Sequence, residues 1–397
     1  MGSALEVLRA FAGLGVRSFG GPIAHLGYFR DEFVERRRWL SEAAYADLIA
    51  LCQFLPGPAS SQVGFAIGLM RAGYPGALAA WLGFTLPSAA LLVAFAFGAH
   101  ALAGPAGAAL LHGLQLAAVA IVANAALAMA RTLCPDRVRA SIALVALLIA
   151  VAASSSGAQL LAIAVGALGG LALCRGLRAA AAADLHVPVG RVAGLAALAS
   201  YFALLLGLPV LRLLRQSPGT ALFEAFYRSG ALVFGGGHVV LPLLRAAVVA
   251  PGWVSDAAFL SGYGAAQAIP GPLFSFAAYL GAVVNVGPGG IAGATIALVA
   301  IFLPGMLLLL GVLPLWQSLR GAPRASAAIA GIHAAVVGLL AAALYDPIWV
   351  TAVHARADLA VAAVCFVLLV AWRAPALVVV ATGATLGLVL TVAAGRG

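Results

Sequence analysis

One sequence pattern occurs twice in this chain, 214 residues apart, and this duplication limits the possible folds more than any other feature. The first copy runs from Trp39 to Pro58 and the second from Trp253 to Pro272, with 8 identical residues at the 20 aligned positions. A duplicated apolar half with Gly and Pro inside its segments is typical of a transport protein whose binding site lies between two inverted halves. We therefore expect an inverted-repeat helical bundle.

The composition places the chain in a membrane. Hydrophobic residues make up 64% of the 397 residues, charged residues make up 9%, and the mean hydropathy is +1.10. This length allows about a dozen apolar segments of the roughly 20 residues that cross a bilayer. We predict an all-α, polytopic membrane protein with little chain left for a soluble domain.

The charge and the cysteines exclude several classes of function. All 22 basic residues are arginine, and most lie in short loops between apolar segments, where they orient the protein in the bilayer. We therefore do not expect nucleic acid as a partner. The four cysteines lack metal-ligand or redox spacing, and no catalytic set or phosphate-binding loop is present. The sequence predicts neither an enzyme nor a bound metal or cofactor.

Hydropathy divides the chain into thirteen apolar segments, arranged as six, one extra segment at 192–211, and six more. We predict a first membrane half at 1–190 and a second at 191–397, which begins with the extra segment. The Ala-rich stretch at 179–189 is the expected connector between them. An odd number of crossings between the starts of the two repeats turns the second repeat upside down.

Four apolar segments are interrupted near their midpoints, by the two Pro-Gly-Pro motifs and by the Phe-Gly-Gly motifs that begin at Phe19 and Phe234. Each arm of about 12 residues is about 18 Å long, half of a bilayer core, so each segment either crosses or turns back as a re-entrant hairpin. If all four turn back, fourteen loop arginines lie inside and six outside. Because the positive-inside rule favours that distribution, we expect four hairpins and nine spans.

The interruptions form the predicted binding site. In hydrocarbon an unsatisfied backbone N–H or C=O group costs several kcal/mol, so a helix break persists only where protein, water or an ion supplies partners. Pro22, Pro58 and Pro272 stand where new helices are expected to start, and each start carries about half a positive charge. Four converging starts offer about +2, which suits a doubly charged oxyanion.

Matched amides and hydroxyls flank the Pro-Gly-Pro motifs. Gln53 and Gln267 each stand three residues before one, Ser60, Ser61 and Gln62 follow the first, and Ser275 follows the second. A buried amide is costly without a partner, and both copies keep it. The two glutamines either contact the substrate or hydrogen-bond the backbone at the break.

Arg17 lies inside an apolar segment, where a charge is expensive and indicates function. It either balances the charge of the substrate, or reaches the interface or pairs with Glu6 or Asp47. His25 and His238 follow the Phe-Gly-Gly motifs; either could carry a coupled proton, and helix capping or packing is the simpler interpretation. The predicted substrate-binding residues are Arg17, Ser18, Phe19, Gly20, Gly21, Pro22, Gln53, Pro56, Gly57, Pro58, Ser60, Ser61, Phe234, Gly235, Gly236, Gly237, His238, Gln267, Pro270, Gly271, Pro272 and Ser275.

These motifs resemble those of the chromate ion transporter family in its long, two-half form. The resembling stretches are Phe19-Gly20-Gly21-Pro22, Gly27-Tyr28-Phe29-Arg30, Trp39-Leu40-Ser41, Leu51 to Pro58, Gly83-Phe84-Thr85-Leu86-Pro87, Phe234 to His238, and Gln267 to Pro272. They cover roughly 11–103 and 223–317. One departure is Arg245 after Leu-Pro-Leu-Leu, where the family often carries an acid.

The resemblance implies a multi-pass protein of the bacterial inner membrane that exports chromate and confers resistance to it. A dianion that leaves a negative-inside cell gains about 4.6 kcal/mol per 100 mV, so export needs no coupled ion. The alternative is a sulfate or other oxyanion importer on the same scaffold, because chromate and sulfate are tetrahedral dianions of similar size. The expected partners are chromate or sulfate and the lipid bilayer, and the oligomeric state, a homodimer included, stays open.

Overall fold

The computed structural model describes residues 2–19, 21–99, 104–152, 156–174, 188–215, 217–234, 239–316 and 323–393. Every regular element within these residues is a helix. Five helices are long and apolar enough to cross a membrane, by length and composition. Helices suit this environment because they satisfy the backbone groups within one segment. The predicted all-α, polytopic architecture is confirmed.

The first half contains α1 (Ala4–Gly15), α2 (Gly21–Phe29), the π-helical turn η1 (Arg30–Arg36), α3 (Glu42–Phe54), α4 (Ala59–Ala99), α5 (Pro105–Leu133), α6 (Arg137–Ala152) and α7 (Ser156–Leu173). The extra segment is α8 (Arg191–Leu214). The rest comprises α9 (Pro218–Ala231), α10 (Val240–Leu244), η4 (Arg245–Val249), α11 (Asp256–Ala268), η5 (Leu273–Ser275), α12 (Phe276–Val283), α13 (Gly290–Val312), η6 (Leu313–Leu315), α15 (Pro323–Ala343), η7 (Leu344–Trp349), α16 (Val350–Ala352), α17 (Arg356–Val370) and α18 (Ala376–Ala393).

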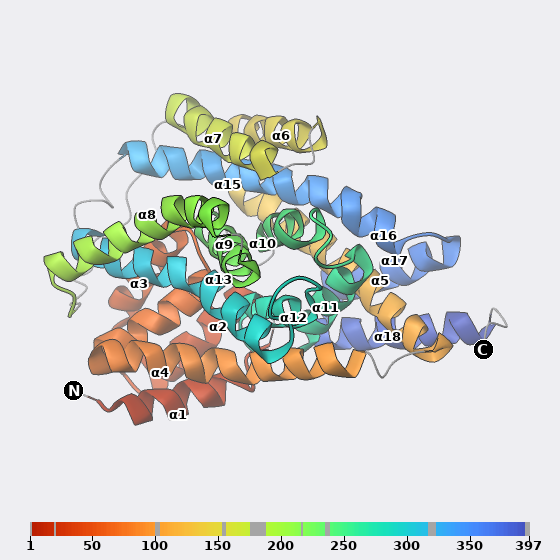
Figure 1. Cartoon of the computed structure of the whole chain (residues 1–397), viewed down its shortest axis with the longest axis horizontal. Helices are drawn as coiled ribbons and strands as arrows, with labels where there is room; N and C mark the ends of the chain where they lie inside the picture. Colours follow the sequence, from red (N-terminus) through yellow and green to blue (C-terminus); the bar gives the residue numbers. More distant parts are fainter. Residues whose placement is uncertain are drawn as a thin grey trace.

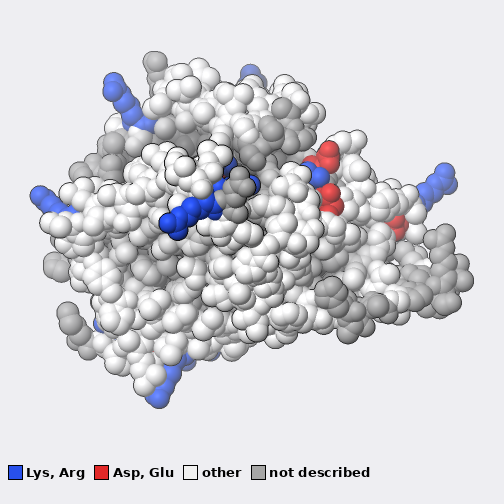
Figure 2. All heavy atoms as spheres, viewed as in Figure 1, with Lys and Arg blue, Asp and Glu red and all other residues white. Residues whose placement is uncertain are grey.

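The helices form a layered bundle (Figure 1). Helices α1 and α4 lie along one edge, α6 and α7 lie at the opposite edge against α15, and the short elements α9 to α12 occupy the middle. Charged side chains are sparse on the face shown in Figure 2, as expected for a surface that faces lipid.

The broken segments of the first half return to the side from which they start. The Gly2 N–H donates to the Arg71 carbonyl (3.0 Å), and the Arg71 guanidinium lies 4.9 Å from the centre of the Trp39 ring. These contacts place the start of α1, the loop before α3 and the turn within α4 at one end of the molecule. The segments α1–α2 and α3–α4 are therefore hairpins.

Helix α4 is itself two arms joined by a turn. Ala72 and Gly73 leave helical geometry, with φ of 65° at Gly73. A side chain added to Gly68 would overlap the carbonyl oxygen of Gly76, so the arms pack closely side by side. The second arm runs to Phe97, whose ring lies next to Gly290. That arm is about 35 Å long at 1.5 Å per residue, which is enough to span a bilayer.

The second half repeats this arrangement at the far end of that arm. The Asn285 N–H donates to the Trp253 carbonyl (3.0 Å), so the two ends of the α11–α12 segment meet. A side chain on Gly287 would touch Pro218 at the start of α9. The α9–α10 and α11–α12 segments are therefore hairpins too, which agrees with the expected four hairpins.

The two halves interlock through their cores. Leu92 and Ala96 of α4 belong to a hydrophobic cluster made mainly of second-half residues, whereas Leu309 and Val312 of α13 belong to a cluster made mainly of first-half residues. Helix α1 packs on α4 as its repeat equivalent α9 packs on α13. The division at residue 190 stays a prediction, since most of the connector lies outside the described residues.

This arrangement predicts that the two hairpin turns face opposite sides of the membrane. With the half-buried Cys134 and Cys174 first replaced by serine, a cysteine at Ala72 should react with an impermeant maleimide only in opened cells. A cysteine at Val286, which is 37% exposed, should react in intact cells. Labelling of both from the same side would contradict the inverted arrangement.

Candidate functional site

The two halves exchange a hydrogen bond at their interruptions. The Gly57 N–H donates to the Val233 carbonyl (2.7 Å), and the Gly271 N–H donates to the Ser18 carbonyl (2.9 Å). Gly57 aligns with Gly271 at an offset of 214, and Ser18 aligns with Val233 at an offset of 215. Each Pro-Gly-Pro break thus binds the Phe-Gly-Gly break of the other half, in a reciprocal pattern that twofold pseudosymmetry generates.

The glycines in both Pro-Gly-Pro motifs have a structural reason. Gly57 and Gly271 have φ of 125° and 108°, a backbone conformation that side chains rarely adopt. A Cβ atom on Gly57 would lie 2.8 Å from the Gln62 amide nitrogen, and one on Gly271 would lie 2.9 Å from the Ser88 hydroxyl. Glycine therefore allows the backbones of the two halves to meet.

His25 links the two reciprocal contacts. Its Nδ1 atom lies 3.4 Å from the Ser60 hydroxyl, just beyond the first Pro-Gly-Pro motif. Its ring meets Phe84 edge-on at 5.2 Å, and the Phe84 carbonyl approaches Gly271. Ser88 also approaches Gly271, and the Ser88 and Ser275 hydroxyls are 2.6 Å apart. The interruptions of both halves therefore surround one polar region.

Several buried polar atoms of this region have no hydrogen-bond partner within the described part of the chain. They are the hydroxyls of Ser18, Ser61 and Thr85, the Nε2 atom of His25 and the Oε1 atom of Gln62. A buried polar group without a partner costs about 1–3 kcal/mol. These five atoms are therefore available for hydrogen bonds to a polar guest.

The two predicted glutamines differ in burial, and a third glutamine, Gln62, makes the hydrogen bonds at the first Pro-Gly-Pro motif. Gln53 is exposed, whereas Gln267 is half-buried with a buried amide nitrogen that has no partner among the described residues. Gln62, which the repeat pattern did not single out, donates from Nε2 to the carbonyls of Pro56 and Gly305, both at 3.0 Å. It aligns with Phe276, so no matched pair pointed to it.

The helix starts fall one residue away from their expected positions. Pro58 immediately precedes α4 and Pro272 is the N-cap of η5, so both stand before the first helical residue, while Pro22 is the second residue of α2. Phe19, Gly21, Pro56 and Phe234 are half-buried, and Pro270 is buried. The predictions for Gly20, Gly235, Gly236, Gly237 and His238 lie outside the described residues.

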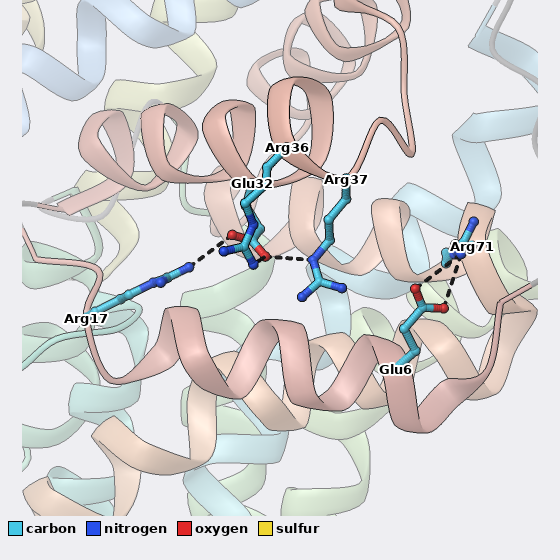
Figure 3. A network of polar contacts seen from close by, with 6 residues as sticks. All are labelled: Glu6, Arg17, Glu32, Arg36, Arg37 and Arg71. Atoms are coloured by element: carbon cyan, nitrogen blue, oxygen red, sulfur yellow. Dashed lines mark hydrogen bonds and ion pairs between the residues drawn. The ribbon is translucent and has the colours of Figure 1, made fainter.

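Arg17 has a partner that its sequence neighbourhood did not indicate. It bonds the Oε2 atom of Glu32 at 3.0 Å, while Arg36 and Arg37 bond the Oε1 atom at 2.5 and 2.6 Å (Figure 3). Glu32 is only 4% exposed. The proposed pairing of Arg17 with Glu6 or Asp47 is wrong, because Glu6 pairs with Arg71 and Asp47 accepts a hydrogen bond from Trp316.

We call Arg17, Glu32, Arg36 and Arg37 the Glu32 cluster. Burial by itself would raise the pKa of Glu32, but the hydrogen bonds and charges of Arg37 and Arg36 outweigh it and hold the pKa below its ordinary value. Three guanidinium groups against one carboxylate leave a formal charge of +2. The cluster taken by itself is therefore positive.

Unlike the Glu32 cluster, one other ion pair occurs in both halves. Arg30 Nε lies 2.8 Å from Glu42, and Arg245 Nε lies 2.9 Å from Asp256. Arg30 aligns with Arg245, and Glu42 aligns with Asp256. Arg245 thus fixes the loop before α11 as Arg30 fixes the loop before α3, which explains an arginine at this position.

No three His, Cys, Asp or Glu side chains within the described ranges lie close enough together to hold a metal ion. The polar groups at the interruptions are hydroxyls, amides and backbone N–H groups. Such groups bind an oxyanion by hydrogen bonds and helix-start charge.

Comparison with known proteins gives a consistent match. The family model described as "Chromate transporter" matches residues 5–171 and 220–388. A "Chromate transport protein" of Pseudomonas aeruginosa is 31% identical over 350 residues, which cover 87% of this chain and 82% of that protein. A "Probable chromate transport protein" of Synechococcus elongatus is 30% identical over 85% of this chain and 83% of its own length. No solved structure matches.

The glycines at the two interruptions should be intolerant of a side chain. We expect Gly57→Ala and Gly271→Ala each to lower the free energy of unfolding by about 1–3 kcal/mol, because both the backbone conformation and the space require glycine. Thermal unfolding of the purified variants in detergent measures this. Gly207→Ala in α8, where no atom lies near an added Cβ, is the matched control and should be neutral or stabilising. Equal thermal stability of the three variants would contradict the requirement for glycine at positions 57 and 271.

The Glu32 cluster should stabilise the protein in a pH-dependent way. Because the pKa of Glu32 is lowered on folding, its contribution is present above the unfolded pKa, near 4.5, and is lost as the pH falls through the folded value. Glu32→Gln should therefore cost about 2 kcal/mol at neutral pH and progressively less below pH 4.5. Thermal unfolding across pH tests this, with the 56% exposed Glu35→Gln as control. A cost that does not change with pH would contradict it.

Proposed function

The chain belongs to the chromate transporter family, and we propose that it exports chromate from the cytoplasm across the bacterial inner membrane and thereby confers resistance. Two of its relatives are named as chromate transport proteins. It is a multi-pass membrane protein. We further propose that the substrate binds where the interruptions of the two halves meet.

One observation carries this proposal most strongly. The reciprocal contacts of Gly57 and Gly271 bring oppositely oriented breaks together around buried polar atoms that lack partners within the described residues. A tetrahedral oxyanion accepts hydrogen bonds on every face. The hydroxyls of Ser18 and Ser61 and the N–H groups that open α2 and α4 are donors of the required kind.

The charge distribution supports an anionic substrate. Two described helix starts and the nearby η5 start supply partial positive charge, and the Glu32 cluster carries a formal +2 at the end of the molecule that holds Arg71. The membrane potential drives a dianion outward by about 4.6 kcal/mol per 100 mV in a negative-inside cell. Export of chromate therefore needs no cotransported ion, whereas uptake does.

The site is closed in this conformation. Ser18, Gln62 and Ser275 are each at most 1% exposed, so no anion reaches them without movement of the hairpins. The reciprocal hydrogen bonds join backbone segments rather than side chains. We propose alternating access in which the hairpins of one half separate from those of the other at one face at a time.

Transport in vesicles tests this function. Everted membrane vesicles with an imposed inside-positive potential should accumulate chromate, and right-side-out vesicles under a negative-inside potential should not. Cells that express the protein should also hold less chromate than cells without it. Preferred uptake of sulfate into right-side-out vesicles would overturn the proposal in favour of an importer.

Variants separate binding from folding in the same assay. Ser18→Ala with Ser61→Ala should reduce chromate transport at least about tenfold, since hydrogen bonds to a charged guest contribute about 1.5–3 kcal/mol. The same change should leave thermal stability unchanged or higher, because the two hydroxyls have no partner among the described residues. Ser141→Ala, on the exposed face of α6, is the control. Full transport by the double variant would remove these hydroxyls from the site.

A further inference from the structure

A cavity of about 410 Å³ lies between α7, α8, α9, η4 and the loop at Trp253. Its charged lining residues are Arg212, Glu224 and Arg228. A neighbouring cavity of about 250 Å³ shares Arg212 and Trp253 and reaches Val286 at the hairpin turn. We call the larger space the Arg212 cavity. It belongs to the end of the molecule opposite Arg71.

The Arg212 cavity occupies the repeat equivalent of the Glu32 cluster. Arg17 aligns with Leu232 and Glu32 aligns with Ala247, both at an offset of 215, and Leu232 and Ala247 line the cavity. Apolar residues, one of them the small Ala247, therefore line a cavity in the second half where an ion-pair network stands in the first. The two repeat-equivalent positions thus differ: the Glu32 cluster fills the one in the first half, and a cavity occupies the one in the second half.

The cavity is positively charged although Leu232 stands in it at the position equivalent to Arg17. Glu224, 4% exposed, holds both arginines, with Arg212 at 3.1 Å and Arg228 at 3.0 Å. Two guanidinium groups present ten N–H donors to the two oxygens of that carboxylate, so most donors remain for another acceptor. In Figure 2 blue side chains gather over the part of the surface where Figure 1 labels α8 and α9.

The arginines are held in place but remain accessible. Their side chains are 46% and 41% exposed, whereas the carboxylate that fixes them is 5% exposed. The Arg212 guanidinium also lies 5.7 Å from the centre of the Trp253 ring. A fixed pair of guanidinium groups at a cavity wall is suited to bind a tetrahedral oxyanion.

We propose that the Arg212 cavity is a second oxyanion site, at which Arg212 and Arg228 bind the substrate dianion between the interruptions and the outer solution. The proposal rests on the function proposed above, because it assigns the cavity to the same anion. Leu232 lies two residues before Phe234, so the cavity wall adjoins the Phe-Gly-Gly break of the second half. An anion released from the interruptions meets this site next.

Protection of a cysteine in the cavity tests the site without transport. Ala247→Cys is made in protein whose half-buried Cys134 and Cys174 are serine. Sulfate serves as the probe, because chromate would oxidise the thiol. We expect sulfate to slow maleimide labelling at least about threefold in detergent, and chloride at equal ionic strength to leave it unchanged. Equal rates in the two salts would overturn the proposal, whatever the arginine variants show.

The arginine variants test which groups bind. With Arg228→Gln, protection should require at least about tenfold more sulfate, as expected for the loss of a charged hydrogen-bonding partner. With Arg228→Lys, the sulfate concentration needed for protection should lie between those of the unchanged protein and Arg228→Gln, because lysine keeps the charge but lacks the planar guanidinium group. The exposed Arg215→Gln, outside the cavity lining, should change nothing. Protection that is independent of Arg228 and Arg212 would contradict the assignment.

Two further measurements distinguish this site from a lipid-binding pocket and from a failure of the export function. If nanodiscs with anionic phospholipid protect the cysteine and sulfate in detergent does not, the cavity binds a lipid phosphate and the proposal is wrong. Chromate transport by the same variants is measured in parallel. Transport without sulfate protection would overturn the cavity site alone. Protection without transport would leave the cavity an oxyanion site and overturn the export function.

Discussion

The hydrogen bonds that Gly57 and Gly271 donate across the two halves are the interaction on which the rest of the structure depends. A helix that stops inside a bilayer leaves polar backbone groups that lipid cannot satisfy. Each half supplies the acceptor that the other half lacks, so the breaks are stable only together. Buried hydroxyls and amides, among them those of Ser18, Ser61 and Gln62, lie close to where these breaks meet.

Charge is distributed unequally along the path that the breaks define. The Glu32 cluster ties Arg17 to the loop that carries Arg36 and Arg37, and this closes one end. At the other end Ala247 leaves a cavity in which two arginines share one carboxylate. Both clusters carry more guanidinium groups than carboxylates, while the interruptions between them are closed to solvent in this conformation.

The sequence predicted the breaks and hairpins because their causes are local. A Pro-Gly-Pro motif needs a positive φ at its glycine, and two copies at one offset point to the same backbone geometry twice. The partner of Arg17 could not be predicted, since Glu32 reaches it only after α2 returns along α1. Gln62 was left out of the predicted site and Ser88 was missed, because their repeat equivalents are Phe276 and, at the offset of the flanking prolines, Gly305.

The joining of two repeats in one chain has an evolutionary consequence. Two identical half-length chains paired in opposite orientation would carry every substitution on both membrane faces. A continuous polypeptide removes that restriction, so the ion pair of Arg30 persists as that of Arg245 while Glu32 has diverged from Ala247. Capture of the cargo on one face and its discharge on the other can then be tuned by selection as separate traits.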